Sequence, residues 1–255
     1  MAKERIDVVL ARKGYAPSRE KARAFVMAGQ VYINNERIAE PDKKISEDAQ
    51  IEIKKNPIPF VSYGGLKLNE AIKAFGIPVK GRRAIDVGSS TGGFVDCLLQ
   101  NGATLVYAID TGTHQLHDSL RRDRRVILKE NCNARYLVFE DIGEKADIIT
   151  IDVSFISLKK ILPVIIQFMS PDAHVISLVK PQFEVGRFQV GKGGIVKDTG
   201  KINRVMEDIM TCGRKLGLTP VHVVEAPRER KRKNREFFIL WALQEPQNQS
   251  SSLPA

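Results

Sequence analysis

Ala84-Ile-Asp-Val-Gly-Ser-Ser-Thr-Gly-Gly-Phe94 is the stretch of this sequence that decides the fold. It combines a short apolar strand, a glycine-rich turn and the first residues of a helix in direct succession. Glycine lets the backbone approach a bound ligand closely, although such a turn alone also suits a dinucleotide, a phosphate or tight packing. No Lys-Ser or Lys-Thr pair follows the glycines and the GxGxxG spacing is incomplete, so neither a nucleoside-triphosphate loop nor a full dinucleotide fingerprint is indicated.

Around this turn, strand-like apolar runs alternate with helical patterns. Such alternation is typical of a parallel sheet covered by helices on both faces, so the predicted class is α/β with a Rossmann-like sheet. We expect strands at 84–87, 104–110, 126–129, 147–153, 175–179, 220–224 and 237–243, with helices at 93–100, 158–168 and 201–216.

Acidic residues near the strand ends suit a ligand that carries a ribose diol and a cationic sulfonium arm. Asp86 precedes the turn, and Asp110 ends the next strand, where its carboxylate would accept both ribose hydroxyls; an exposed strand-end acid is the alternative. The third strand ends at Asn131, where loop groups could contact adenine. This pattern favours S-adenosylmethionine as the cofactor, with candidate contacts at Asp86, Gly88, Ser89, Gly92, Gly93, Phe94, Asp110 and Asn131.

The first 55 residues have a different pattern, which predicts a separate α+β domain. Two short helices are expected at 5–13 and 18–28, the second with Ser18 as its N-cap and Gly29 just past its end. A hairpin turning at Asn34-Asn35 and a strand at 51–53 should follow. We therefore predict domains at 1–55 and 62–245, a proline-containing linker at 56–61, and a polar, Ser-rich, disordered tail at 246–255.

The charge of the chain favours a polyanionic partner. Lys and Arg number 40 against 30 Asp and Glu, which gives a formal net charge of +10. In the N-terminal domain the cations gather on the two helices. They could contact RNA phosphates, but on charge alone a solvated helix face explains them equally well. The candidate RNA-binding residues are Arg5, Arg19, Lys21 and Arg23.

Cysteine usage and hydropathy argue against several other classes of protein. The three cysteines lie far apart without a CxxC pair, so neither a disulfide framework nor a metal site is expected. The N-terminus has no apolar leader, and the longest apolar run is too short to cross a bilayer. The expectation is a cytoplasmic protein with no membrane partner and no evident obligate protein partner.

Two groups of motifs resemble known families. Asp7-x-x-Leu10, Gly14, Ser18-Arg19, Ala22 and Gly29-Gln-Val31-x-Ile-Asn34 closely resemble the S4 domain, which implies binding of structured RNA. The run from Asp86 to Phe94 resembles the first motif of FtsJ-type RNA ribose 2′-O-methyltransferases. The whole chain resembles the TlyA family, which joins these two domains; further matching segments are 62–68, 151–155, 178–184 and 234–238.

The TlyA resemblance implies a reaction and a set of catalytic residues. The reaction is methylation of ribose 2′-hydroxyls in ribosomal RNA, on cytidines, with ribosomal RNA or ribosomal subunits as partners. The family's Lys-Asp-Lys-Glu tetrad falls on Lys67, Asp152, Lys180 and Glu236. One departure is Asn131, because relatives of FtsJ type usually carry an acid at that position.

Such a tetrad suits methyl transfer to a hydroxyl, which is a poor nucleophile and benefits from a base and from in-line placement. Our hypothesis is that Lys180 takes the proton and Lys67 positions or polarises the hydroxyl, while Asp152 holds the Lys180 amine and Glu236 orients a lysine. The segment Asp152-Val-Ser-Phe155 lacks the two prolines typical of enzymes that methylate exocyclic base nitrogens, which favours oxygen as the acceptor.

Some features leave alternatives open. The basic segments 186–194 and 228–235 could guide an RNA backbone or could be solvated loops, and Phe183 and Phe188 could stack a base or pack in the core. Because members of this family are often labelled haemolysins, pore formation is a competing function, and a catalytically idle RNA-binding protein is another. Neither the sequence pattern nor the intact tetrad supports these two alternatives.

Overall fold

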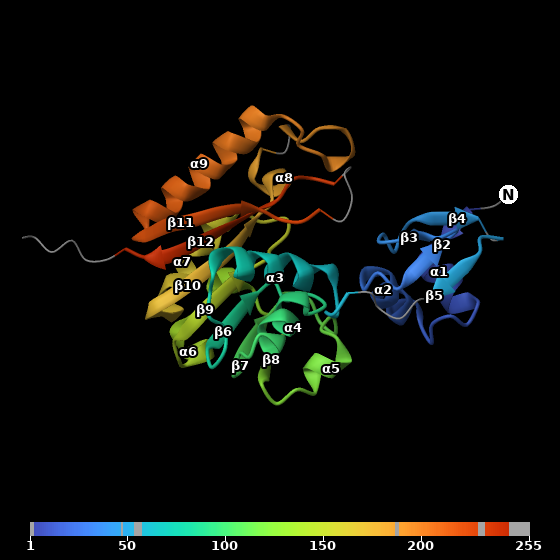
Figure 1. Cartoon of the computed structure of the whole chain (residues 1–255), viewed down its shortest axis with the longest axis horizontal. Helices are drawn as coiled ribbons and strands as arrows, with labels where there is room; N and C mark the ends of the chain where they lie inside the picture. Colours follow the sequence, from blue (N-terminus) through green and yellow to red (C-terminus); the bar gives the residue numbers. More distant parts are fainter. Residues whose placement is uncertain (1–2, 47, 54–57, 187–188, 229–232, 245–255) are drawn as a thin grey trace, which may run out of the picture.

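A computed structural model describes residues 3–46, 48–53, 58–186, 189–228 and 233–244. Two bodies are visible in Figure 1, a small N-terminal domain and a larger domain built around one sheet. The predicted linker 56–61 lies partly, and the predicted tail 246–255 wholly, outside the described residues. The domain boundaries therefore stay predictions. Among the described residues, no helix is long and apolar enough to span a bilayer.

The N-terminal domain has the predicted helix pair and hairpin. The Ser18 side chain accepts a hydrogen bond from the Lys21 amide, and Gly29 follows the second helix with a φ of +71°. Asn34 and Asn35 both have positive φ, which a tight hairpin turn requires. The elements are β1 (Lys3–Arg5), α1 (Ile6–Arg12), α2 (Arg19–Met27), β2 (Val31–Ile33), β3 (Glu36–Arg37), β4 (Lys44–Ser46) and β5 (Ile51–Ile53).

The pairing β1 with β4 is a feature that the sequence pattern did not predict. Both strands have three residues, and neither has a run of alternating apolar side chains, so no local signal marks them. The other strands of this domain pair in the order β3-β2-β5. Ile6, Leu10, Val26 and Val31 are fully buried and form part of a separate hydrophobic core.

The larger domain is a mixed sheet in the order β11-β12-β10-β9-β6-β7-β8. The strands from β10 to β8 are parallel, as predicted, whereas β12 runs antiparallel to both of its neighbours. The strands are β6 (Arg83–Val87), β7 (Leu105–Ile109), β8 (Val126–Lys129), β9 (Ala146–Ile151), β10 (Met169–Val179), β11 (Leu218–Glu225) and β12 (Phe237–Leu243).

Helices cover both faces of this sheet, so successive strand residues enter different cores. Ile148 packs in the core under the first helices of the domain, while its neighbour Ile149 packs in the core on the other face. The helices are α3 (Tyr63–Phe75), α4 (Gly93–Gln100), α5 (Asp118–Arg121), α6 (Phe139–Ile142), α7 (Leu162–Ile165), α8 (Pro181–Glu184) and α9 (Thr199–Lys215) (Figure 1).

The predicted single helix at 158–168 is wrong. The structure has a 3₁₀ turn at Leu158–Lys160, the short helix α7, and a second 3₁₀ turn at Ile166–Phe168. Pro163 explains the break, because proline has no N–H and is accepted only in the first turn of a helix. The strand predicted at 175–179 is also longer in the structure, since β10 starts at Met169.

Candidate active site

The candidate site forms where the parallel strands end. Val87 pairs with Ile151, and Ile151 with Ser177, so strands β6, β9 and β10 finish close together. Asp152 follows β9 directly and Lys180 follows β10. Ligands of open α/β sheets bind at this carboxyl edge, which makes both residues candidates for contact with a ligand.

Lys180 and Asp152 form one ion pair of the site. The Lys180 Nζ lies 2.5 Å from Oδ1 of Asp152, and it also donates a hydrogen bond of 3.0 Å to the Ser154 hydroxyl. The two side chains are only 13% and 24% exposed, so they are held in a partly dehydrated environment. This arrangement fixes the Lys180 amine at the end of its strand.

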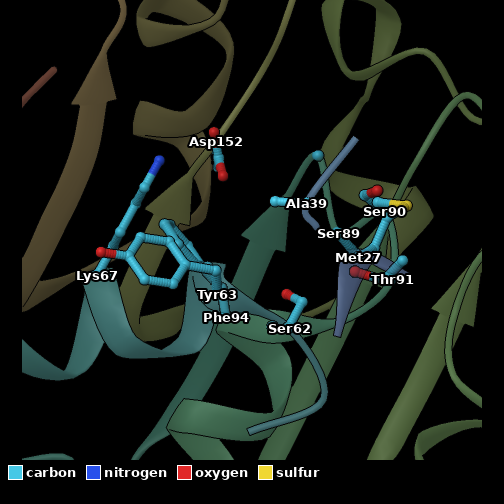
Figure 2. Close-up of a pocket in the computed structure, with 13 residues that line it drawn as sticks. Met27, Ala39, Ser62, Tyr63, Lys67, Ser89, Ser90, Thr91, Phe94 and Asp152 are labelled. Carbon is cyan, nitrogen blue, oxygen red and sulfur yellow. The ribbon is translucent and has the colours of Figure 1, made fainter. Parts of the chain in front are cut away.

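Lys67 and Glu236 form the second ion pair, with 2.6 Å between Nζ and Oε2. Burial lowers the pKa of Lys67, but the negative charges of Glu236 and Asp152 outweigh it, so the pKa is raised above its ordinary value. Figure 2 shows the charged ends of Lys67 and Asp152 directed toward one another. The structure therefore brings all four tetrad residues together.

Glycines explain how Lys67 reaches the site from the start of α3. A Cβ added to Gly65 would lie 2.8 Å from the carbonyl oxygen of Gly93 and 2.4 Å from the Phe60 side chain. Only glycine permits this approach between the first turns of α3 and α4. Gly65 makes this close contact with the glycine-rich turn, and Lys67 follows two residues later, which places it beside the turn.

The glycine-rich turn passes beside Asp152. Gly88 has a φ of +88°, and an added Cβ would lie 2.4 Å from the Asp152 carbonyl oxygen. Asp110 holds the turn through its carboxylate, which accepts hydrogen bonds of 2.7 Å from the amides of Ser90 and Gly112. The turn is therefore open to a ligand on one side and fixed by the next strand on the other.

Two adjoining cavities meet at this turn. The larger, of about 730 Å³, contains Asp110, Asn133, Ile109 and Asp152 in its wall, and its size lies within the range of about 300–1,000 Å³ usual for small-molecule sites. The smaller, of about 240 Å³, is lined by Lys67 and Asp152 and by the glycine turn (Figure 2). Both cavities share Gly88, Ser90 and Asp152.

The predicted cofactor contacts do not all reach the larger cavity. Gly88 and Asp110 line it, whereas Ser89, Gly93 and Phe94 line the smaller one. The other three predicted contacts, Gly92, Asp86 and Asn131, line neither of the two cavities.

Two of these residues have clear positions elsewhere. Asp86 is fully buried beneath the turn, where Thr150 donates a hydrogen bond to it, and burial raises the pKa of Asp86 to about 7. Asn131 is exposed, and Asn133 occupies the cavity wall instead.

Phe155 is a candidate site residue that sequence reasoning missed. Its side chain is 91% exposed, its φ is +63°, and it belongs to the wall of the larger cavity. A left-handed backbone at a bulky residue costs on the order of 1 kcal/mol or more, so it persists only where surrounding contacts maintain it. Its ring contacts Phe183 at a centroid distance of 4.8 Å. Phe188, the other predicted stacking residue, lies outside the described residues.

In the N-terminal domain, the predicted RNA-binding arginines gather around one buried carboxylate. Arg5 and Arg19 each approach an oxygen of Asp7 at 3.0 Å, and Arg23 approaches at 3.7 Å. Burial raises the pKa of Asp7, but hydrogen bonds from Arg5 and Arg19 outweigh it and hold the pKa below its usual value. Lys21 instead pairs with Asp118 of the larger domain.

The sheet order, the glycine turn and the lysine–acid pairs at the strand ends are those of a methyltransferase with a Rossmann-like fold. Comparison with known proteins identifies the family. Residues 60–243 match the FtsJ-like methyltransferase model and residues 4–51 match the S4 domain model. This chain belongs to the FtsJ-like methyltransferases and, with its S4 domain, to the TlyA family.

Relatives with two different names match most of the chain. It is 41% identical over 236 residues to the 16S/23S rRNA (cytidine-2′-O)-methyltransferase TlyA of Mycobacterium tuberculosis, covering 92% of this chain and 88% of that one. It is 40% identical over 216 residues to Hemolysin A of Brachyspira hyodysenteriae, covering 83% and 90%. A solved structure from Streptococcus thermophilus, whose description carries the haemolysin name, superposes with a TM-score of 0.75 at 39% identity, covering 99% and 93%.

Proposed function

We propose that this protein transfers a methyl group from S-adenosylmethionine to the 2′-hydroxyl of a cytidine in ribosomal RNA. The observation that carries the proposal is the meeting of two lysine–carboxylate pairs, Lys180 with Asp152 and Lys67 with Glu236, beside the glycine turn. The Mycobacterium tuberculosis relative is named for rRNA (cytidine-2′-O)-methyltransferase activity, which supports the substrate, and the S4 domain supports RNA binding. A ribosomal RNA substrate makes the cytoplasm the expected compartment.

The larger cavity fits S-adenosylmethionine. Asp110 would accept hydrogen bonds from the ribose hydroxyls, and the apolar Ile109 and Ala134 would flank the adenine with Asn133 at its edge. The wall also contains Arg135 and Lys160, so the favourable charge for a cationic sulfonium comes from the Asp152 and Asp110 carboxylates locally and not from the cavity as a whole. When bound there, the cofactor supplies an electrophilic methyl group.

The two lysines would act differently on the ribose hydroxyl. Because the pKa of Lys67 is raised, Lys67 stays protonated and can donate a hydrogen bond to the hydroxyl but cannot accept its proton. Lys180 is the group that would take the proton in its neutral form, after its own ammonium proton has passed to solvent. Asp152 and Ser154, which line the cofactor cavity, hold its amine there. Glu236 would keep Lys67 in place through its ion pair with the Lys67 amine.

No structural observation favours pore formation. The haemolysin name occurs among the relatives, but the described residues contain no helix that could span a bilayer. The two lysine–carboxylate pairs beside the glycine turn would also have no role in pore formation. We therefore keep the methyltransferase as the single proposed function.

The experiment is a radiolabelled methyl-transfer assay on ribosomal RNA, on isolated subunits and on whole ribosomes. Lys180→Ala should lower turnover about 10²- to 10⁴-fold, the usual contribution of a proton acceptor, while the cofactor Kd stays nearly unchanged. Lys215→Ala, at an exposed position on α9, is the matched control. Full turnover by Lys180→Ala, or a label on base nitrogen, would contradict the proposal.

A further inference from the structure

Two segments that follow neighbouring strands are joined by a series of contacts. One is residues 154–158 after β9, and the other is residues 180–184 after β10, which includes α8. Lys180 donates to Ser154, and the rings of Phe155 and Phe183 are in contact. The catalytic pair Asp152–Lys180 lies at the start of these two segments.

Glu184 makes the last of these contacts and uses both carboxylate oxygens. Oε2 accepts a hydrogen bond of 2.5 Å from the Ser157 hydroxyl, and Oε1 accepts one of 2.8 Å from the Leu158 amide. Ser157 and Leu158 begin the 3₁₀ turn at 158–160, so Glu184 anchors the point at which the segment 154–158 returns to regular structure.

This carboxylate is placed where a charge is costly. Burial raises the pKa of Glu184, although the hydrogen bonds from Ser157 and Leu158 act in the opposite direction. Burial of an acid is costly unless hydrogen bonds compensate for the lost water, and here both carboxylate oxygens accept one. The position therefore suits a hydrogen-bonding group that fixes the geometry of the facing segment.

Phe155 is the residue whose geometry depends on this anchor. Its own packing is slight, because the side chain is 91% exposed and Phe183 is the ring that it contacts among the described residues. Its left-handed backbone lies two residues before Ser157. Without the anchor, Ile156 and Leu158 would still pack against the core, but the end of the segment would lose two hydrogen bonds. Phe155 could then relax toward ordinary backbone angles and withdraw its ring from the cavity wall.

We propose that Glu184 is a positioning residue for methyl transfer: its carboxylate fixes the segment 154–158 so that Phe155 projects from the cavity wall toward the acceptor nucleotide. The inference rests on the proposed function for its substrate. Glu184 does not contact the reacting atoms in this proposal. It affects RNA methylation only by holding Phe155 in position.

A double-mutant cycle tests the route through Phe155. Glu184→Ala should lower kcat/KM for ribosomal RNA about 10-fold, as expected for a displaced substrate-contacting group, with the cofactor Kd changed less than about 3-fold. In the Phe155→Ala background, the same substitution should cost less than about 2-fold. An equal loss in both backgrounds would overturn the proposal, because Glu184 would then act independently of Phe155.

Conservative variants separate hydrogen bonding from charge. Glu184→Gln keeps an oxygen for the Leu158 amide and an amide group for the Ser157 hydroxyl, so it should retain activity within about 3-fold of the unmodified protein. A loss as large as that of Glu184→Ala would overturn the proposal. Glu207→Ala, an exposed acid on α9 paired with Arg214, is the matched control and should leave activity unchanged.

A second readout needs no activity. Phe155→Trp introduces an exposed indole, whereas the native Trp241 is fully buried, so acrylamide quenching and anisotropy report mainly on position 155. Adding Glu184→Ala should increase the rotational mobility of the new indole. Unchanged mobility would overturn the proposal for Glu184. If the protein failed to methylate ribosomal RNA, the proposed function would fail, but this comparison would still decide the role of Glu184.

Discussion

The Lys67 Nζ lies 2.6 Å from Oε2 of Glu236, although the two residues are 169 positions apart in the sequence. Helix α3 brings the lysine to the glycine turn, and the residue before β12 brings the acid to the same edge of the sheet. The pair keeps Lys67 charged, since the carboxylates raise its pKa against the effect of burial. In the proposed function, Lys67 is therefore the lysine that donates a hydrogen bond to the ribose hydroxyl, and Lys180 is the one that takes its proton.

Glu236→Gln tests this difference between the two lysines through the pH dependence of the reaction. Removing the negative charge should lower the pKa of Lys67, so Lys67 loses its proton at a lower pH and the alkaline limb of the kcat/KM profile moves to lower pH. The rate should also fall about 10- to 100-fold, because Lys67 is no longer held in place. Steady-state kinetics across pH measure both effects. An alkaline limb that stays fixed would argue against a protonated Lys67.

Asp110→Ala tests the proposed cofactor contact. The substitution removes an acceptor for the ribose hydroxyls and also frees the amides of Ser90 and Gly112. Hydrogen bonds to a charged group contribute about 1.5–3 kcal/mol, so the Kd for S-adenosylmethionine should rise about 10- to 100-fold. Isothermal titration calorimetry measures the change. Asp172→Ala, at an exposed acid on β10, should bind the cofactor normally.

Arg19→Ala tests the arginine cluster around Asp7. If Arg19 contacts a phosphate, its loss should weaken RNA binding and reduce the slope of log K against log salt by about 0.7–0.9. Filter binding at several salt concentrations gives the slope. Arg214→Ala, on the exposed face of α9, should leave the slope unchanged. If both variants gave the same slope, the arginines around Asp7 would stabilise the domain and would not contact RNA phosphates.

Substitutions at two adjacent glycines should have opposite effects on stability. Gly65→Ala would place a Cβ against Phe60 and the Gly93 carbonyl, and should lower the free energy of unfolding by about 1–3 kcal/mol. Gly64→Ala meets its nearest neighbour at 3.4 Å and should raise that free energy by up to about 1 kcal/mol through helix propensity. Urea denaturation compares them. If both substitutions destabilised the protein equally, the close contact between α3 and α4 would not depend on Gly65 in particular.

Much of the fold could be predicted because its signals are local. The boundaries of α4 and β8 agree with the predicted ranges, as do the capping of α2 by Ser18 and the Asn34-Asn35 turn. The errors have local causes as well. Pro163 breaks the helix predicted over 158–168, and the strands of the β1–β4 pair have no alternating apolar residues.

The site was predictable in its residues but less so in its contacts. Motif matching selected Lys67, Asp152, Lys180 and Glu236, and the structure brings them together. It did not indicate that Phe155 is exposed beside them, because exposure depends on how the segment after β9 packs. The charge pattern assigned Lys21 to RNA but did not indicate its ion pair with Asp118, which the structure shows.

The sequence by itself determined the order of strands and helices, the glycine turn and the types of residue at the strand ends. Those properties follow from backbone preferences and side-chain spacing within a few neighbouring residues. Only the tertiary structure decided which acid meets which lysine, and that Arg5 and Arg19 share one buried carboxylate. These pairings depend on how distant segments pack, and a Coulomb interaction depends on the final distance and burial rather than on separation along the chain.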